Sequence, residues 1–235
     1  MWLGKMKKTL DVLSTILVTL AAALLIWTQV EGRWMGSARR PQVQDVKGLK
    51  IEASYIRHTR GTGTVAVVEF TDYECPFCAQ HTRKTAPNIE KSLVDTGAVR
   101  HIVFNFPLER IHPRARKAAE AAECSARQGQ YWPMHERLFG GSENLSEQEL
   151  MQFADTLELD RTAFSRCLAG QAADAITSDV AEGRRLGICS TPTFFVGMVQ
   201  GDGSIALAKR LNGAVPFEDF QKAVDAVRAM KADLH

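Results

Sequence analysis

A strand that runs directly into two closely spaced cysteines restricts the fold of this sequence more than any other feature. Residues 64–70 read as a buried apolar strand, and a short polar turn joins them to Cys75-Pro76-Phe77-Cys78. The composition turns helical from Pro76, which suits the first turn of a helix because it loses no hydrogen bond there. Unpaired N–H groups and the helix dipole stabilise negative charge at this end, so the pattern predicts a reactive thiolate at Cys75.

The C-x-x-C spacing allows a reversible disulfide, because one helical turn brings the two sulfurs together. Cys75, at the exposed end, is predicted to be the attacking thiolate, with a pKa below the free value of ~8.5. Cys78 is predicted to be the buried resolving thiol, which closes the disulfide and expels the partner. The competing interpretation is half of a metal site. The other three cysteines stand alone and no H-x-x-x-H is present, so we expect no metal and no other cofactor.

The order of the remaining elements is typical of one fold class. A helix and a second apolar strand at residues 99–106 complete a β-α-β unit with C-x-x-C at the start of its helix. Residues 113–187 are almost entirely helical in pattern. Strand character resumes as a hairpin at 193–199 and 204–208, and a closing helix covers 217–231. We therefore predict an α/β, thioredoxin-like fold with a helical insertion over residues 113–187.

An uncharged, largely apolar segment at residues 12–30 predicts a membrane anchor. Its nineteen residues, at about 1.5 Å each, come close to the hydrocarbon thickness of roughly 30 Å. A cleaved signal peptide is the alternative, with Gly36-Ser37-Ala38 as its cleavage site. The apolar stretch is longer than the usual ~7–15 residues, and that site lies far beyond its end. Both interpretations export the domain, and outside the cytoplasm a C-x-x-C can rest as a disulfide.

The sequence thus divides into three parts. Residues 1–35 form a short cytoplasmic tail and one N-terminal transmembrane helix, and residues 36–55 form a polar tether. Residues 56–235 form the thioredoxin-like domain. Residues 51–56 are expected to include a short strand, and residues 57–63, which hold two glycines, to form a turn. The formal net charge of +2 argues against nucleic-acid binding by phosphate neutralisation.

Two further residues are placed where they could serve the cysteines. Glu69 interrupts the apolar strand, either as a carboxylate at the strand's end in water or as a buried acid beside the cysteine pair. Pro192, in Thr191-Pro192, enters the strand at 193–199, and such a proline belongs at an edge, at a first strand position or in a special turn. An ordinary loop proline is the alternative, and a cis peptide bond is found at only a small minority of prolines.

Together these motifs resemble those of the DsbA-type thiol:disulfide oxidoreductases, in particular their single-chain, often membrane-tethered bacterial branch. The resemblance runs from about residue 64 to the C-terminus. It is carried by Val68-Glu69-Phe70 before Cys75-Pro76-Phe77-Cys78; Phe106-Pro107-Leu108 with His112-Pro113; Gln128-Gly129-Gln130-Tyr131-Trp132 with Met134-His135; and Gly187 leading to Thr191-Pro192-Thr193-Phe194-Phe195-Val196.

The resemblance implies specific roles. Thr191-Pro192 corresponds to the family's cis-proline loop, which lies against the disulfide and hydrogen-bonds an incoming peptide through the backbone before the proline. Glu69 matches the buried acid that helps take the proton from the resolving cysteine, Cys78. The helical insertion covers one side of the active site and helps to shape its substrate surface.

The resemblance also bears on the other cysteines. Cys124 and Cys167 correspond to positions where many relatives hold a second, structural disulfide, the alternative being two buried small apolar side chains. Cys189 is expected to be a lone thiol near the site.

The two residues between the cysteines depart from the best-known strong oxidants, which carry Pro-His where this chain has Pro76-Phe77. Without a histidine to donate toward the Cys75 thiolate, the reduced form is less stabilised, so the sequence predicts a weaker oxidant. Histidines elsewhere, among them His81, His101, His112 and His135, are expected to have no catalytic role.

The resulting functional hypothesis is an exported enzyme that donates its Cys75–Cys78 disulfide to cysteine-containing exported proteins through a mixed disulfide on Cys75. A quinone-linked membrane partner would reoxidise it, and it would act as a monomer. A reductase or isomerase kept reduced by a membrane electron donor is the first alternative, and the lack of a dimerisation module weakens isomerase. A peptide-binding chaperone that keeps the fold is the second.

Overall fold

The computed structural model describes residues 21–22, 43–140 and 144–232. The chain divides into two compact units, residues 1–40 and residues 41–235, and the second carries the fold described below. The predicted tail and anchor at residues 1–35 lie outside the described residues, apart from 21–22. Among the residues that are described, no helix is long and apolar enough to cross a membrane.

A seven-stranded mixed sheet forms the centre of the second unit, with the order β1-β7-β6-β4-β5-β3 and with β2 also pairing with β7. Strand β4 runs parallel to β5 and antiparallel to β6, and all of its residues are buried. The strands are β1 (Gln44–Asp45), β2 (Lys50–Ile51), β3 (His58–Arg60), β4 (Val65–Thr71), β5 (Val99–Asn105), β6 (Thr193–Val199) and β7 (Ile205–Asn212). The strand that leads to the cysteines is therefore the middle of the sheet, as its continuous apolar run predicts.

The segment before β4 differs from the sequence prediction. Within the expected tether at residues 36–55, β1 and β2 both pair with β7, so this part belongs to the sheet. The short strand expected at residues 51–56 is wrong beyond its first residue, because a 3₁₀ turn, η1 (Ala53–Tyr55), follows β2. The expected turn at residues 57–63 contains the edge strand β3. Such short edge strands are held by backbone hydrogen bonds to a neighbouring strand. With two or three residues each, they are too short to show the alternation of apolar and polar residues that predicts a strand.

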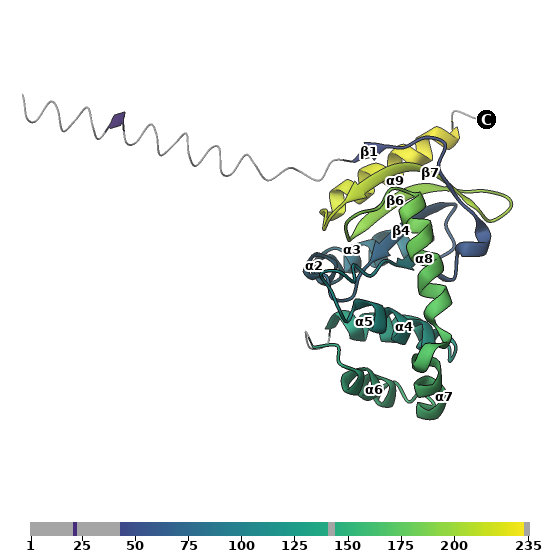
Figure 1. The fold of residues 1–235 in the computed structure, drawn as a ribbon. Coiled ribbons are helices and arrows are strands. Elements are labelled where there is room, and N and C mark those ends of the chain that lie inside the picture. The colour runs from purple at the N-terminus through teal and green to yellow at the C-terminus, as the bar shows by residue number, and fades with distance from the viewer. Residues whose placement is uncertain (1–20, 23–42, 141–143, 233–235) are drawn as a thin grey trace, which may run out of the picture. The chain divides into compact units, whose positions relative to one another are not determined.

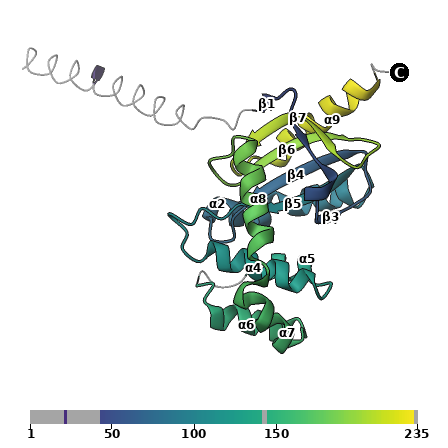
Figure 2. The ribbon, with the colours of Figure 1, turned by 45° about the vertical axis from the view of Figure 1, so that its right-hand side comes forward.

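Helices cover both faces of the sheet. Side chains of alternate β4 residues pack with α9 (Phe217–Ala232) on one face, and those between them pack beside α8 (Ala173–Arg185) on the other. Figures 1 and 2 both show α8 crossing the sheet. The helix after the cysteines is broken into α2 (Pro76–Lys84), α3 (Ala86–Ile89) and a π-helical turn, η2 (Glu90–Val94), because Pro87 lacks the N–H that a continuous helix needs.

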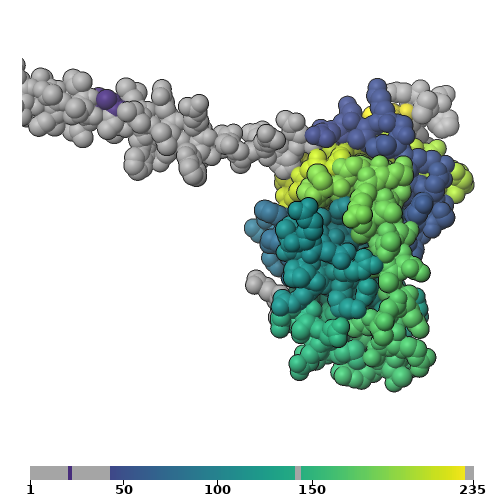
Figure 3. All heavy atoms as spheres, viewed as in Figure 1, coloured from purple at the N-terminus to yellow at the C-terminus, as the bar shows by residue number. Residues whose placement is uncertain are grey.

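The helical insertion packs around its own apolar core, which also takes in Cys75 and Cys78. It consists of α4 (Ala115–Ala126), α5 (Tyr131–Gly140), α6 (Glu147–Thr156), α7 (Arg161–Arg166), a π-helical segment η3 (Cys167–Gln171) and α8. The Ser146 hydroxyl caps α6 by accepting a hydrogen bond from the Glu149 amide. In the space-filling view, the insertion helices, teal to green, form the lower part of this unit (Figure 3). The order of strands and helices agrees with the predicted α/β fold, with a block of helices between β5 and β6.

Candidate active site

The turn between β4 and α2 positions the first cysteine at the start of a helix. Cys75 is the N-cap residue of α2 and Pro76 is its first helical residue. The Cys75 amide donates a hydrogen bond of 3.1 Å to the Asp72 carbonyl, and the Glu74 amide donates one of 2.8 Å to the Asp72 carboxylate. The Phe77 side chain, by contrast, is 59% exposed and lies at the surface beside the pair. Local hydrogen bonding therefore sets the conformation that presents Cys75.

The same Asp72 carboxylate ties this turn to the loop that follows β5. Its Oδ2 atom accepts hydrogen bonds from the Leu108 amide, at 2.7 Å, and from His112 Nδ1, at 2.8 Å. Glu74 adds a further link, since its carboxylate accepts a hydrogen bond from the Arg114 amide. Asp72 is buried, and its sequence position alone predicted no role for it. The sequence signal that could have indicated this role is the position of an acidic residue in the turn just before the C-x-x-C.

Cys75 lies against the loop that contains Pro192, and the Thr191–Pro192 peptide bond is cis. As a thiol, its sulfur donates a hydrogen bond of 3.4 Å to the Thr191 carbonyl. The Cys75 residue is only 4% exposed, so it is more enclosed than its position at a helix end suggested. The predicted pair of elements, the C-x-x-C and Thr191-Pro192, is thus brought into direct contact.

The two cysteines have pKa values that move in opposite directions. A hydrogen bond from the Cys78 thiol is the main cause that lowers the pKa of Cys75 to about 6, with help from the backbone N–H groups of Phe77 and Cys78. Complete burial raises the pKa of Cys78 well above its usual value, and the neighbouring Cys75 charge adds to this, although Thr71 and the Asp72 amide act in the other direction. At neutral pH the reduced pair therefore holds a Cys75 thiolate beside a Cys78 thiol.

Glu69 lies on the same face of β4 as Thr71. The Thr71 side chain lies next to the Cys78 thiol. The Glu69 carboxylate is buried and its Oε2 atom is 3.0 Å from His101 Nε2 on β5. His81, on α2 one turn beyond Cys78, lies 3.9 Å from the same oxygen. Burial disfavours the ionised form, but the His101 hydrogen bond and the charges of the surrounding histidines outweigh it, so the pKa of Glu69 falls to about 2. Of the two interpretations offered by the sequence, the buried acid is the one observed.

Histidines are the residues that sequence reasoning missed around this site. His81 and His101 flank Glu69, His112 binds Asp72, and His135 lies 2.9 Å from the Tyr73 hydroxyl through its Nδ1 atom. These histidines are far apart in sequence and come from four different segments, two helices, a strand and a loop, so no local motif joins them. Only the pairing of β4 with β5, and the packing of α2 on the sheet, brings two of them to one carboxylate.

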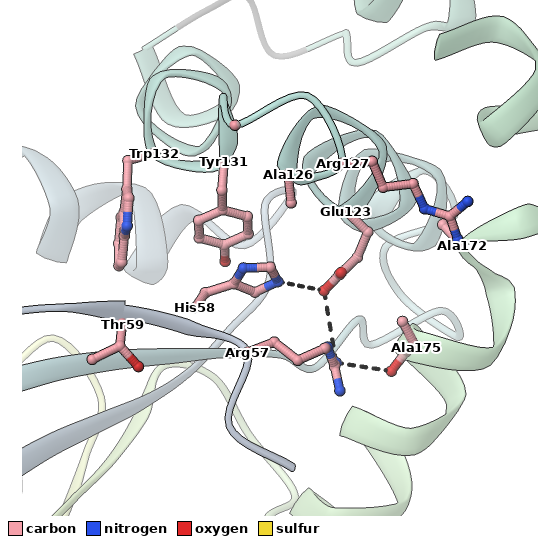
Figure 4. Close-up of a pocket in the computed structure, with 11 residues that line it drawn as sticks. Arg57, His58, Thr59, Glu123, Ala126, Arg127, Tyr131, Trp132, Ala172 and Ala175 are labelled. Carbon is pink, nitrogen blue, oxygen red and sulfur yellow. Dashed lines mark hydrogen bonds and ion pairs between the residues drawn. The ribbon is translucent and has the colours of Figure 1, made fainter. Parts of the chain in front are cut away.

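A second polar cluster lies away from the cysteines, between the sheet edge and the insertion. Arg57 and His58 converge on Glu123 of α4, and the His58 ring stacks on Tyr131 at 3.6 Å (Figure 4). They line a cavity of about 420 Å³. Arg57 also pairs with the buried Asp179 of α8.

Asp179 itself extends this cluster to the sheet, because it accepts hydrogen bonds from the Asn105 amide and side chain on β5. Burial raises the pKa of Asp179 to about 6, despite the Arg57 charge beside it. The cluster therefore fastens α4 and α8 to β3 and β5, and this is a structural role.

The remaining cysteines are separate from the redox pair. Cys124 of α4 and Cys167 of η3 are joined in a disulfide, whereas Cys189 is an exposed free thiol. Within the described parts of the chain, no group of three or more His, Cys, Asp or Glu side chains is arranged to hold a metal ion.

Comparison with known proteins agrees with this geometry. Residues 61–226 match the family model described as thioredoxin. The chain belongs to the thioredoxin family. It shares 29% identity with a thioredoxin-like oxidoreductase from Silicibacter pomeroyi, over 73% of this chain and 92% of that one, with a TM-score of 0.60. Alpha-DsbA1 from Wolbachia pipientis matches 75% of this chain over 94% of its own, at 24% identity and a TM-score of 0.62.

The chain thus shares its fold with this DsbA protein, and the predicted resemblance is confirmed at the level of the thioredoxin family. BdbD from Bacillus subtilis has the same fold, with a TM-score of 0.62 at 20% identity over 78% of this chain and 98% of its own.

Curated relatives are much longer proteins. Na(+)/H(+) antiporter NhaA 3 from Salinispora tropica is 39% identical over 142 residues, which are 59% of this chain but 21% of that protein. The chain therefore spans about a fifth of the length of this relative.

Proposed function

We propose that this protein is an exported thiol:disulfide oxidoreductase that passes its Cys75–Cys78 disulfide to cysteine-containing proteins. The observation that carries the proposal is the opposite perturbation of the two thiols on one helical turn, with the pKa of Cys75 lowered to about 6 and that of Cys78 raised. A low pKa makes Cys75 a good leaving group and a high one keeps Cys78 protonated. This asymmetry suits a pair that exchanges disulfides through one sulfur.

The chemistry follows in two steps. A substrate thiolate attacks Cys75 Sγ, the Cys75–Cys78 bond breaks, and Cys78 leaves and takes up a proton. A second substrate thiolate then attacks the substrate sulfur of the mixed disulfide, and Cys75 leaves as a stabilised thiolate. The substrate loses two electrons and becomes a disulfide, while the Cys75–Cys78 disulfide gains them. We assign Glu69 to the proton transfer at Cys78, Thr191 and Pro192 to substrate backbone binding, and Pro76 and Phe77 to tuning the pair.

Trapping of the mixed disulfide tests this proposal. A Cys78→Ser variant is first charged with glutathione as a mixed disulfide on Cys75. A reduced substrate protein that displaces the glutathione should then remain attached to Cys75, because the variant lacks the second thiol, and should be released by reducing agent. Cys189 is exposed, so the experiment is done in a Cys189→Ser background, and Cys75→Ser/Cys78→Ser is the control. Equal attachment to the double variant would contradict the proposal. Full activity in cells of a Cys75→Ser variant would instead favour a peptide-binding chaperone.

The direction of exchange is tested by the redox state of the pair in cells. Acid quenching followed by alkylation should find Cys75 and Cys78 mostly as a disulfide if the protein donates disulfides to its substrates. A pair found mostly as a dithiol would favour the alternative, a reductase or isomerase supplied with electrons at the membrane.

Membrane attachment is part of the proposal and is supported by the apolar segment at residues 12–30. The redox domain would then act as a monomer outside the cytoplasm, with a quinone-linked membrane partner to reoxidise it. Carbonate washing of membranes should leave an anchored protein in the pellet. Release into the wash, with a mature N-terminus near residue 38, would favour a cleaved signal peptide.

A further inference from the structure

His101 lies between the buried Glu69 carboxylate and a cavity on the far side of it. The His101 ring is hydrogen-bonded to Glu69 and also lines a cavity of about 190 Å³, together with Arg60, Trp132, His135 and Glu136. The Glu136 side chain is 62% exposed, so this cavity is bounded by a residue at the surface. A space of this size has room for several water molecules.

A proton must reach or leave Cys78 each time its disulfide bond breaks or forms. Glu69 is a poor place to hold that proton, because its hydrogen bond to His101 stabilises the carboxylate and lowers the pKa of Glu69. Burial lowers the pKa of His81 to about 4 and that of His135 to about 3, so both stay neutral at physiological pH. Neither of these rings is hydrogen-bonded to Glu69 in the described residues, which leaves His101 as its one such partner there.

The arginine beside this cavity is already paired with carboxylates. Arg60 of β3 stacks over Trp132 at 3.8 Å and pairs with Glu90 of η2, at 3.0 Å, and with Glu136 of α5, at 2.7 Å. The arginine charge is therefore balanced by two carboxylates at the mouth of the cavity. Glu69 from β4, His81 from α2 and His135 from α5, whose ring contacts the Tyr73 hydroxyl, are further titratable groups near the His101 ring.

We propose that His101 carries protons between Glu69 and water in this cavity while Cys78 is reduced and reoxidised. The inference rests on the proposed function, because it needs Glu69 to exchange a proton with Cys78. When Cys78 leaves the disulfide as a thiolate, His101 Nδ1 takes a proton from water as Nε2 gives one to Glu69, and Glu69 passes it to sulfur. The hydroxide is neutralised in bulk solvent, and exchange with cavity water returns the ring to the tautomer with a proton on Nε2, which is hydrogen-bonded to Glu69 in the reduced protein. When Cys78 is reoxidised the transfers run in reverse, so each cycle restores the starting tautomer.

Reduction of the Cys75–Cys78 disulfide by dithiothreitol, followed between pH 5 and pH 9, tests the proposal. His101→Gln keeps a hydrogen-bonding group beside Glu69 but cannot take up a proton at one ring atom and release one at the other, so it should slow the reaction on the order of tenfold across this pH range. His101→Ala should be slowed similarly, and added imidazole should restore most of its rate. Wild-type rates for His101→Gln would overturn the proposal, as would imidazole that fails to rescue His101→Ala.

Two further variants separate the possible causes of failure. His135→Ala opens the same cavity without touching Glu69, so imidazole should leave its rate unchanged, and equal rescue there would overturn the assignment to His101. Glu69→Gln should be as slow as His101→Gln. If Glu69→Gln is slow while the His101 variants are normal, only the relay fails. If Glu69→Gln reacts at the wild-type rate, the proposed role of Glu69 fails as well.

Discussion

At the scale of single residues, the site depends on the different environments of two chemically identical thiols that lie one helical turn apart. Cys75 receives hydrogen bonds from Cys78 and from backbone N–H groups at the helix start, while Cys78 has lost all contact with solvent. Both effects follow from a three-residue offset along α2. The offset places one sulfur before the first turn and the other beneath it, where desolvation dominates.

The lowered pKa of Cys75 predicts that the reduced protein gains stability as pH rises. A thiol whose folded pKa is about 6, against an ordinary value of 9.0, stabilises the fold fully above pH 9 and loses that contribution as pH falls toward 6. Urea unfolding of the reduced protein at pH 6 and pH 8 measures this. The increase should disappear in Cys75→Ala, since groups such as Asp179 titrate alike in both proteins. Equal pH dependence in the two would contradict the assigned pKa.

Phe77 is predicted to limit how oxidising the pair is. Phe77→His would place a donor next to the Cys75 thiolate, which stabilises the reduced form and lowers the pKa of Cys75. The equilibrium with glutathione should therefore shift toward reduced protein by about tenfold or more, the equivalent of ~1.4 kcal/mol. Phe77→Leu is the matched control and should leave the equilibrium within about twofold. A wild-type equilibrium already as oxidising as Phe77→His would show that the histidine is unnecessary.

At the scale of elements, β4 determines the site because helices pack on both of its faces. Its last residues lead into the cysteine turn, and the Asp72 carboxylate at that point also accepts hydrogen bonds from the loop after β5. On the opposite face α8 approaches closely at Gly183. An added Cβ there would lie 2.5 Å from two ring atoms of Phe106. The close approach of this helix requires a residue without a side chain.

Gly183→Ala should therefore destabilise the protein, by about 1–3 kcal/mol, although alanine is the better helix former by roughly 1 kcal/mol. The added methyl group would push Phe106 and Phe70 out of their packed positions beneath α8. Chemical unfolding of both proteins in the oxidised state measures the difference. Gly140→Ala, at the end of α5, is the control, because none of the residues that the structure describes lies within 4 Å of its added Cβ. A Gly183→Ala protein as stable as the control would refute the close packing.

At the scale of the whole domain, side-chain contacts hold the helical insertion to the thioredoxin-like part. The insertion segments that the structure describes, from α4 to α8, contribute no strand to the sheet. The cluster of Arg57, His58, Glu123, Asn105 and Asp179 joins two strands to α4 and α8. Inside the insertion, the Cys124–Cys167 disulfide links α4 to η3. The redox cysteines pack against the insertion core, so its position defines one wall of the site.

Removal of this disulfide should lower stability without changing the chemistry of the active site. The bridge closes a loop with a sequence separation of 43 residues. In the chain-entropy model such a loop corresponds to about 4 kcal/mol, with about 2–4 kcal/mol typical of measured cases. Cys124→Ala/Cys167→Ala should thus unfold at lower urea concentration, while its equilibrium with glutathione at Cys75–Cys78 stays the same. A large shift in that equilibrium would show that the insertion tunes the redox pair.

Sequence alone was sufficient for the features that depend on neighbours along the chain. The C-x-x-C at a strand-to-helix junction, the insertion helices and the closing hairpin all follow from local composition and periodicity, and they lie where predicted. Strands β1 and β3 were missed and β2 was placed too late in the chain, because these short strands are held by main-chain hydrogen bonds, which side-chain patterns do not record.

Only the tertiary structure could decide what surrounds the two sulfurs. The contact between Cys75 and Thr191 joins residues 116 positions apart, and the pair of Glu69 and His101 forms because β4 lies next to β5. The sequence leaves His101 without a role, since a histidine in a strand has no local signature of its partner. The physical reason is that pKa values and proton routes depend on burial and on charges brought together through space. The sequence determined which groups are reactive, and the packing determined which residues lie beside them.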